Sequence, residues 1–155
     1  MEIQNRWHEE TSGKISAYQS SLSKKQQKKY QLDLLARVTR RVAGFYEECG
    51  ECQLFQQEIT AYVNDLGNMV HLADNTRRKQ YGKRLKQTVR HLKGQHKLVP
   101  KGHYVGIWTS IGTGIGVAIG AVMEGIGAGI PIGIGLGVAI GMMLDAKAKR
   151  EDRVI

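Results

Sequence analysis

The chain has 155 residues and a formal net charge of +9, from 23 lysines and arginines against 14 aspartates and glutamates. Two cysteines are too few for a disulfide-stapled domain, and glycines without a period of three exclude a collagen-like chain. The charged start, MEIQNRWHEE, lacks the apolar core of a cleaved signal peptide, so we expect none there. Residues 1–101 carry the whole positive excess, whereas 12 of the 19 glycines lie between Gly106 and Gly141. This division argues against a simple soluble globule.

The first part of the chain shows helical periodicity and almost no strand signal. Residues 1–22 are polar and weakly periodic, so we expect a polar arm or a short extra helix there. Ser23 and Gln26 resemble a capping box at the start of a helix. Apolar residues then recur at helical spacing on both sides of Gly50. Residues 23–75 are therefore predicted to form a pair of helices.

Cys49-Gly-Glu-Cys52 lies at the predicted turn between these helices. The pair can act as redox thiols, because this spacing can lower a thiol pKa, although the βαβ context typical of such motifs is missing. It can bind a metal with two more ligands, and the candidates are His71, His91 and His96, but the 38 residues between Cys52 and His91 match no standard finger spacing. It can also be two small side chains packed at a helix corner. The sequence leaves these interpretations open and assigns no metal and no cofactor.

Residues 76–101 contain ten lysines and arginines and no acidic residue. Tyr81, Leu85 and Leu92 form part of an apolar strip, so a basic amphipathic helix is predicted. Next to a membrane segment, such a helix is typical of contact with anionic headgroups, where each cation contributes about 1 kcal/mol. A solvated bundle face is the alternative, and we do not expect nucleic-acid binding because no recognised motif accompanies the charge. The predicted headgroup-binding residues are Lys79, Lys83, Lys86, Arg90, Lys93 and Lys97.

The segment from Gly102 to Leu144 has 43 residues and one formal charge, Glu124. One helical bilayer crossing takes about 20 apolar residues. The segment is therefore predicted to cross twice, over residues 104–123 and 126–144, with the turn at Glu124-Gly125.

Charge around this hairpin, residues 102–145, predicts its orientation. The basic helix precedes the hairpin and a basic tail, residues 146–155, follows it. Because positive flanks stay on the cytoplasmic side, we expect a multi-pass protein of the inner cell membrane with both termini cytoplasmic. Pro131 is expected to kink the second span.

Glycines recur at a spacing of four in both predicted spans. This spacing places them on one helix face, where missing side chains let helices approach closely in lipid. In water each such glycine costs about 1 kcal/mol relative to alanine, so their number indicates a packing role. The predicted helix-packing residues are Gly112, Gly116, Gly120, Gly125, Gly129, Gly133, Gly137 and Gly141. A second small-residue stripe, which leaves a face for neighbouring copies, comprises Gly102, Gly106, Ser110, Gly114 and Ala118.

The GxxxGxxxG runs within residues 102–150 resemble the glycine-zipper segments of bacterial two-span membrane proteins. The resemblance implies packing of membrane helices, and in some members of that group the helices line oligomeric pores. No family resemblance extends to residues 1–101.

The sequence thus predicts an all-α protein with a small cytoplasmic helical bundle, a basic amphipathic helix and a C-terminal two-helix transmembrane hairpin. Its predicted function is self-assembly in an anionic bilayer as a homo-oligomer, which could form a pore or channel with Glu124 at its mouth. The alternative is a membrane-anchored adaptor or a redox or metal sensor, in which the hairpin only tethers the domain bearing Cys49 and Cys52 to a cytoplasmic protein partner. No nucleophile–base pair or phosphate loop is present in the sequence, so we do not expect an enzyme.

Overall fold

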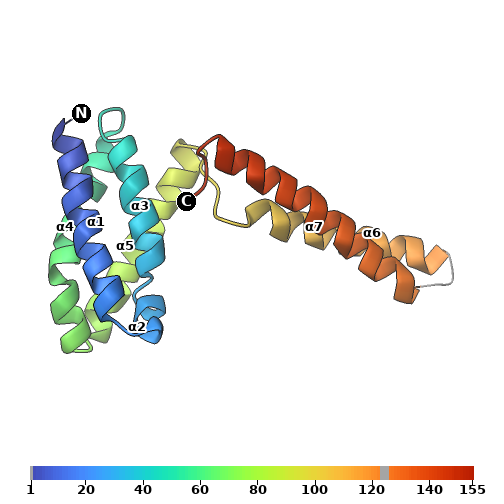
Figure 1. The fold of residues 1–155 in the computed structure, drawn as a ribbon, viewed down its shortest axis with the longest axis horizontal. Helices are drawn as coiled ribbons and strands as arrows, with labels where there is room; N and C mark the ends of the chain where they lie inside the picture. The colour runs from blue at the N-terminus through green and yellow to red at the C-terminus, as the bar shows by residue number, and fades with distance from the viewer. Residues whose placement is uncertain (1, 123–125) are drawn as a thin grey trace. The chain divides into compact units, whose positions relative to one another are not determined.

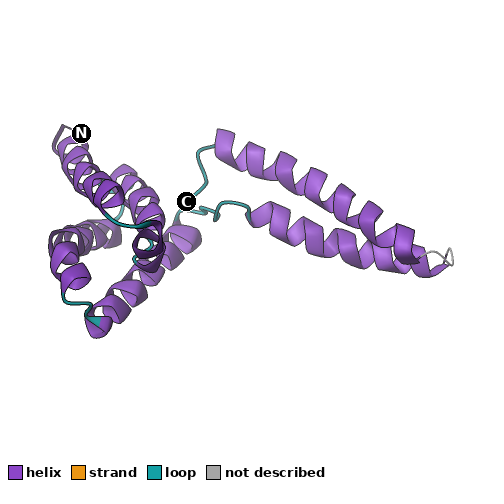
Figure 2. Cartoon of the chain, turned by 60° about the horizontal axis from the view of Figure 1, so that its bottom comes forward, coloured by secondary structure: helices purple, strands orange, loops and turns teal. Residues whose placement is uncertain are grey.

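The computed structural model describes residues 2–122 and 126–155. Within these ranges the chain forms seven α-helices and no β-strand. Figures 1 and 2 show how the helices are arranged within each part of the chain. The prediction of an all-α chain is confirmed. The chain divides into two compact units, residues 1–96 with Ile155 and residues 97–154.

The first unit is a helical bundle. Its helices are α1 Glu2–Ser21, α2 Lys24–Lys29, α3 Leu32–Gly44, α4 Gly50–His71 and α5 Asn75–Gln95. The third helix packs against α1, α4 and α5, and it contributes Leu35 and Val38 to the core, where each is at most 1% exposed. Val63 and Leu66 of α4 meet the same core. The apolar periodicity of the sequence therefore faces the centre of the bundle.

The polar N-terminal segment forms the long helix α1 rather than an arm. Its Trp7 Nε1–H donates a hydrogen bond to Thr60 Oγ1 at 2.8 Å, and Lys14 Nζ donates to Asn64 Oδ1 at 2.8 Å. Ile15 is 1% exposed. A single covered face explains the weak periodicity, because most of α1 remains in solvent.

The predicted capping box is confirmed at the start of α2. Ser23 N–H donates to Gln26 Oε1 at 3.1 Å, and Gln26 N–H donates to Ser23 Oγ at 3.3 Å. The helix does not continue unbroken, because Gln31 adopts a left-handed conformation with φ 51° and separates α2 from α3.

Two buried tyrosines tie this break to the rest of the bundle. Tyr30 hydroxyl donates to the carbonyl oxygen of Met69 at 3.0 Å, and Tyr81 hydroxyl donates to the carbonyl oxygen of Tyr30 at 2.8 Å. Burial raises the pKa of Tyr81, so its phenol stays a donor. The pair links α5 to α4 through the chain between α2 and α3.

A short connection joins α4 to α5. The Asp74 carboxylate accepts hydrogen bonds from the backbone N–H groups of Thr76 and Arg77, at 2.8 and 3.0 Å, and caps α5. The first of these helices therefore ends at His71, and the second begins at Asn75 directly after its cap.

The second unit contains α6 His103–Val122 and α7 Ile126–Arg150, which lie side by side along their length (Figure 2). Both are long and apolar enough to cross a membrane by length and composition. The Asp145 carboxylate accepts from the N–H groups of Tyr104 and Val105, at 3.1 and 3.2 Å, and so caps α6 from α7. The second helix runs through Pro131.

Candidate functional site

The interface between α6 and α7 is made of glycine. A Cβ added to Gly112 would collide with the carbonyl oxygen of Gly133, and one added to Gly116 would collide with that of Gly129. Similar collisions with α6 backbone would occur at Gly137 and Gly141. Any side chain larger than hydrogen would therefore push the two helices apart.

Seven of the eight predicted helix-packing residues lie in this interface: Gly112, Gly116, Gly120, Gly129, Gly133, Gly137 and Gly141. Gly125 and the predicted pore-mouth residue Glu124 lie outside the described residues. The spacing of four is thus used within one chain, to close the hairpin.

The large apolar side chains of the hairpin point away from this interface. In α6 the buried residues are Gly112, Gly116 and Gly120. Isoleucines on both helices are exposed, with Ile115 at 54% and Ile132 at 63%. The exposed large apolar residues of the two helices are Ile107, Ile111, Ile115, Val117, Ile119, Val122, Ile132, Ile134, Leu136, Ile140, Met142 and Met143. The hairpin is therefore inverted relative to a water-soluble helix pair, which buries its bulky side chains.

A second group of glycines takes no part in closing the hairpin. Gly106 and Gly114 on α6, and Gly127 and Gly135 on α7, have no atom within 4 Å of an added Cβ, apart from chain neighbours and their own helix backbone. Gly106 and Gly114 belong to the second small-residue stripe of the sequence.

The predicted headgroup-binding residues are all exposed: Lys79, Lys83, Lys86, Arg90, Lys93 and Lys97. Five of them lie on α5, while Lys97 follows the helix with φ 52°. Tyr81, Leu85 and Leu92 on the same helix are buried in the bundle. The amphipathic pattern of α5 is thus satisfied by the bundle on its apolar side.

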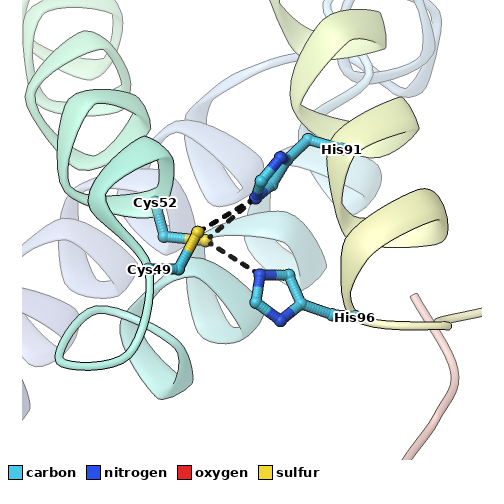
Figure 3. Close-up of side chains that lie close together, drawn as sticks. All are labelled: Cys49, Cys52, His91 and His96. Carbon is cyan, nitrogen blue, oxygen red and sulfur yellow. Dashed lines mark hydrogen bonds between the residues drawn. The ribbon is translucent and has the colours of Figure 1, made fainter.

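Two cysteines and two histidines converge at one end of the bundle, as Figure 3 shows. Cys49 is the N-cap of α4 and Cys52 lies in its first turn, whereas His91 lies in the last turns of α5 and His96 is its C-cap. One ligand atom from each lies within 4.8 Å of the others. His71, the third candidate histidine, is exposed at the far end of α4 and lies outside this cluster.

Both sulfur atoms face imidazole nitrogens. Cys49 Sγ lies 3.2 Å from His91 Nε2, and Cys52 Sγ lies 3.6 Å from the same nitrogen and 3.5 Å from His96 Nε2. Cys52 is fully buried. Both cysteines are free thiols.

Neighbouring side chains orient both imidazole rings. Glu51 lies between the two cysteines in the sequence, and its carboxylate contacts His91 Nδ1. This contact leaves Nε2 of the same ring turned toward the sulfurs. The ring of His96 stacks on Phe45, with centroids 3.8 Å apart and an interplanar angle of 18°. The ring of Phe55 lies 5.4 Å from that of His91.

The electrostatics of the cluster favour neutral groups. Burial, with hydrogen bonding and charge repulsion from Cys49, raises the pKa of the Cys52 thiol to about 12. Burial lowers the pKa of His96, and the charge of the nearby His91 lowers it further. A reactive redox cysteine has a depressed thiol pKa, so Cys52 lacks this property.

Cys52 and His91 are far apart in the sequence but meet because their two helices pair antiparallel. The two residues lie on consecutive helices of 22 and 21 residues joined by a short connection. An antiparallel pair of equal length brings the start of the first helix beside the end of the second. Cys52 lies 22 residues before Asp74 and His96 lies 22 residues after it, so this equal spacing about the turn would have indicated the cluster.

The chain matches no family model, no curated protein and no solved structure. Its candidate sites therefore rest on their own geometry.

Proposed function

We propose that this chain is an integral protein of the cell membrane whose α6–α7 hairpin spans the bilayer and holds the helical bundle at the cytoplasmic surface. The observation that carries the proposal is the inverted hairpin, with glycine inside and isoleucine outside. In water, exposed apolar surface costs about 25 cal/mol per Å², and soluble monomers rarely expose contiguous patches beyond a few hundred Å². In hydrocarbon the same surface carries no such cost.

The dimensions of the hairpin suit a bilayer. At 1.5 Å per residue, the 20 residues of α6 extend about 30 Å, close to the thickness of the hydrocarbon core. Lys147, Lys149 and Arg150 lie at the end of α7, beyond the apolar stretch. Because two crossings return the chain to its starting side, both basic flanks share one face, which the positive-inside rule makes cytoplasmic.

The membrane proposal is tested by a lysine on the exposed face of the hairpin. Ile115→Lys places a charge where the side chain is 54% exposed, which is harmless in water but costs about 2.5–3.5 kcal/mol at the centre of a membrane helix. We expect wild-type protein to resist alkaline extraction from membranes and Ile115→Lys to be partly released.

Leu54→Lys is the matched control, because Leu54 is a 60% exposed apolar residue on α4 of the bundle. This variant is expected to remain in the membrane. Wild-type protein that is released by alkaline extraction, or remains soluble without detergent, would contradict the proposal.

The open glycines favour a second function, self-association of hairpins in the bilayer. The intrachain interface leaves Gly106 and Gly114 without packing partners. They lie eight residues apart on α6, with Ser110 midway between them. Small residues at this spacing let helices of neighbouring copies approach closely in lipid.

Self-association is tested by comparing Gly114→Leu with Val117→Leu, since Val117 is an exposed apolar residue of the same helix. We expect the glycine variant alone to reduce oligomer size in mild detergent. Wild-type protein that is monomeric in detergent and in lipid vesicles would exclude self-association. This result would not affect the proposal that the hairpin anchors the chain in the membrane.

A further inference from the structure

The cluster at the end of the bundle has the composition of a zinc site. Two thiolates and two neutral imidazoles form one of the common ligand sets of structural Zn²⁺. The two thiolate charges balance the charge of the dication, so the complex as a whole is neutral and suits a half-buried position. The softness of the sulfur ligands favours zinc over magnesium or calcium.

The distances fit a single tetrahedral ion. With Zn–S of about 2.3 Å and Zn–N of about 2.0–2.1 Å, a tetrahedral ion holds each sulfur about 3.6 Å from each nitrogen. Three of the four sulfur–nitrogen distances in the cluster are 3.2, 3.6 and 3.5 Å, and all four ligand atoms lie within 4.8 Å of one another. Each of these three distances is within a few tenths of an ångström of the tetrahedral value.

The surroundings also match those of a metal-binding histidine. Such a histidine usually presents its second ring nitrogen to a carboxylate, which fixes the tautomer and leaves the first nitrogen free to coordinate. Glu51 makes this contact with His91 Nδ1. Stacking on Phe45 holds the ring of His96 with its Nε2 toward Cys52.

We propose that the bundle binds one Zn²⁺ ion in a closed tetrahedral site, with the ligand atoms Cys49 Sγ, Cys52 Sγ, His91 Nε2 and His96 Nε2. Binding forms four metal–ligand bonds and releases the two thiol protons to solvent. Four protein ligands leave no position for water or substrate, so the site is structural. It joins the start of α4 to the end of α5, and Glu51 is a positioning residue.

This inference goes beyond the proposed membrane function and does not depend on it. The ligands all belong to the first unit, so zinc binding and membrane insertion can succeed or fail separately.

The test is the zinc content of the full-length chain, purified in mild detergent under reducing conditions with an affinity tag that contains no histidine. We expect about one zinc per chain in the wild type and little in Cys52→Ser or His96→Ala. His71→Gln is the matched control, because His71 is on α4 but outside the cluster, and it should retain its zinc.

Cobalt substitution keeps the test independent of folding defects. Co²⁺ in the wild type should give the intense visible bands of a tetrahedral ion and the charge-transfer bands of thiolate ligands. His96→Cys keeps four ligands, so it should retain the ion with an altered spectrum. Glu51→Gln should retain the tetrahedral spectrum but bind zinc about 10–100-fold more weakly.

Three results would overturn the zinc site. The first is a reduced wild-type chain that takes up neither zinc nor cobalt, and the second is zinc that persists in both Cys52→Ser and His96→Ala. The third is a reversible Cys49–Cys52 disulfide in a chain whose reduced form binds no metal, which would identify a redox pair instead.

Discussion

Gly112 and Gly133 lie so close across the hairpin that a Cβ on either one would collide with the carbonyl oxygen of the other. The two helices are thus held at backbone contact, where dispersion forces act between main-chain atoms rather than side chains. Gly135, two residues along α7, has open space around it. This difference between neighbouring glycines allows a direct experiment.

Gly133→Ala should destabilise the hairpin by about 1–3 kcal/mol, because the added methyl group forces the backbones apart. Gly135→Ala should be neutral or slightly stabilising, since alanine favours helix by up to about 1 kcal/mol. Unfolding in mixed micelles, followed by Trp108 fluorescence in a Trp7→Phe background, measures both. Equal effects of the two substitutions would show that the glycine interface does not control stability.

Asp145→Ala should expose the start of α6. The substitution removes the acceptor for two backbone N–H groups, which costs about 0.5–2 kcal/mol for a helix cap. Amide hydrogen exchange should accelerate at Tyr104 and Val105 and stay unchanged near Gly116. Asp145→Asn keeps one acceptor oxygen, so its exchange rates at these two amides should fall between those of the wild type and the alanine variant. Equal exchange rates in all three chains would argue against the cap.

Tyr81→Phe should destabilise the bundle by about 1–3 kcal/mol, because the buried carbonyl oxygen of Tyr30 loses its partner. Thermal unfolding followed by circular dichroism measures the change. Tyr46→Phe, at a half-buried tyrosine beyond the end of α3, is the control and should leave the midpoint nearly unchanged. A Tyr81→Phe chain as stable as this control would contradict the role of the buried pair.

Zinc removal should lower the stability of the bundle. A ligand that binds only the folded state stabilises it by about 2.7 kcal/mol at a free concentration of 100 times its Kd. A chelator should therefore lower the unfolding midpoint of the wild type but not that of His96→Ala, which has already lost the site. An equal drop in both chains would point to an effect of the chelator unrelated to these ligands.

In the metal-free chain Cys52 should be alkylated much more slowly than an ordinary thiol at pH 8. Its pKa is raised to about 12, so the fraction of reactive thiolate at pH 8 is lower by roughly 1,000-fold than for a thiol of pKa 9. Mass spectrometry of timed iodoacetamide reactions distinguishes it from Cys49. Fast alkylation at Cys52 would indicate a depressed pKa and favour the redox interpretation.

Local signals in the sequence were enough to predict much of the fold. The Ser23–Gln26 capping box, the helical periodicity of the bundle and the glycine spacing each act within a few residues, so each could be predicted without tertiary contacts. The left-handed break at Gln31 carried no such signal, because glutamine rarely adopts that conformation.

The sequence by itself determined the all-helical character of the chain, the uneven distribution of charge and the apolar glycine-rich segment, because these depend on composition and on the helical period. Tertiary structure alone decided which surfaces the glycines join and which two of three histidines reach the cysteines. Periodicity places a residue on a helix face but does not say which helix that face meets. The pairing of α4 with α5 brought Cys52 and His91 together across 38 intervening residues, and the pairing of α6 with α7 turned isoleucine outward.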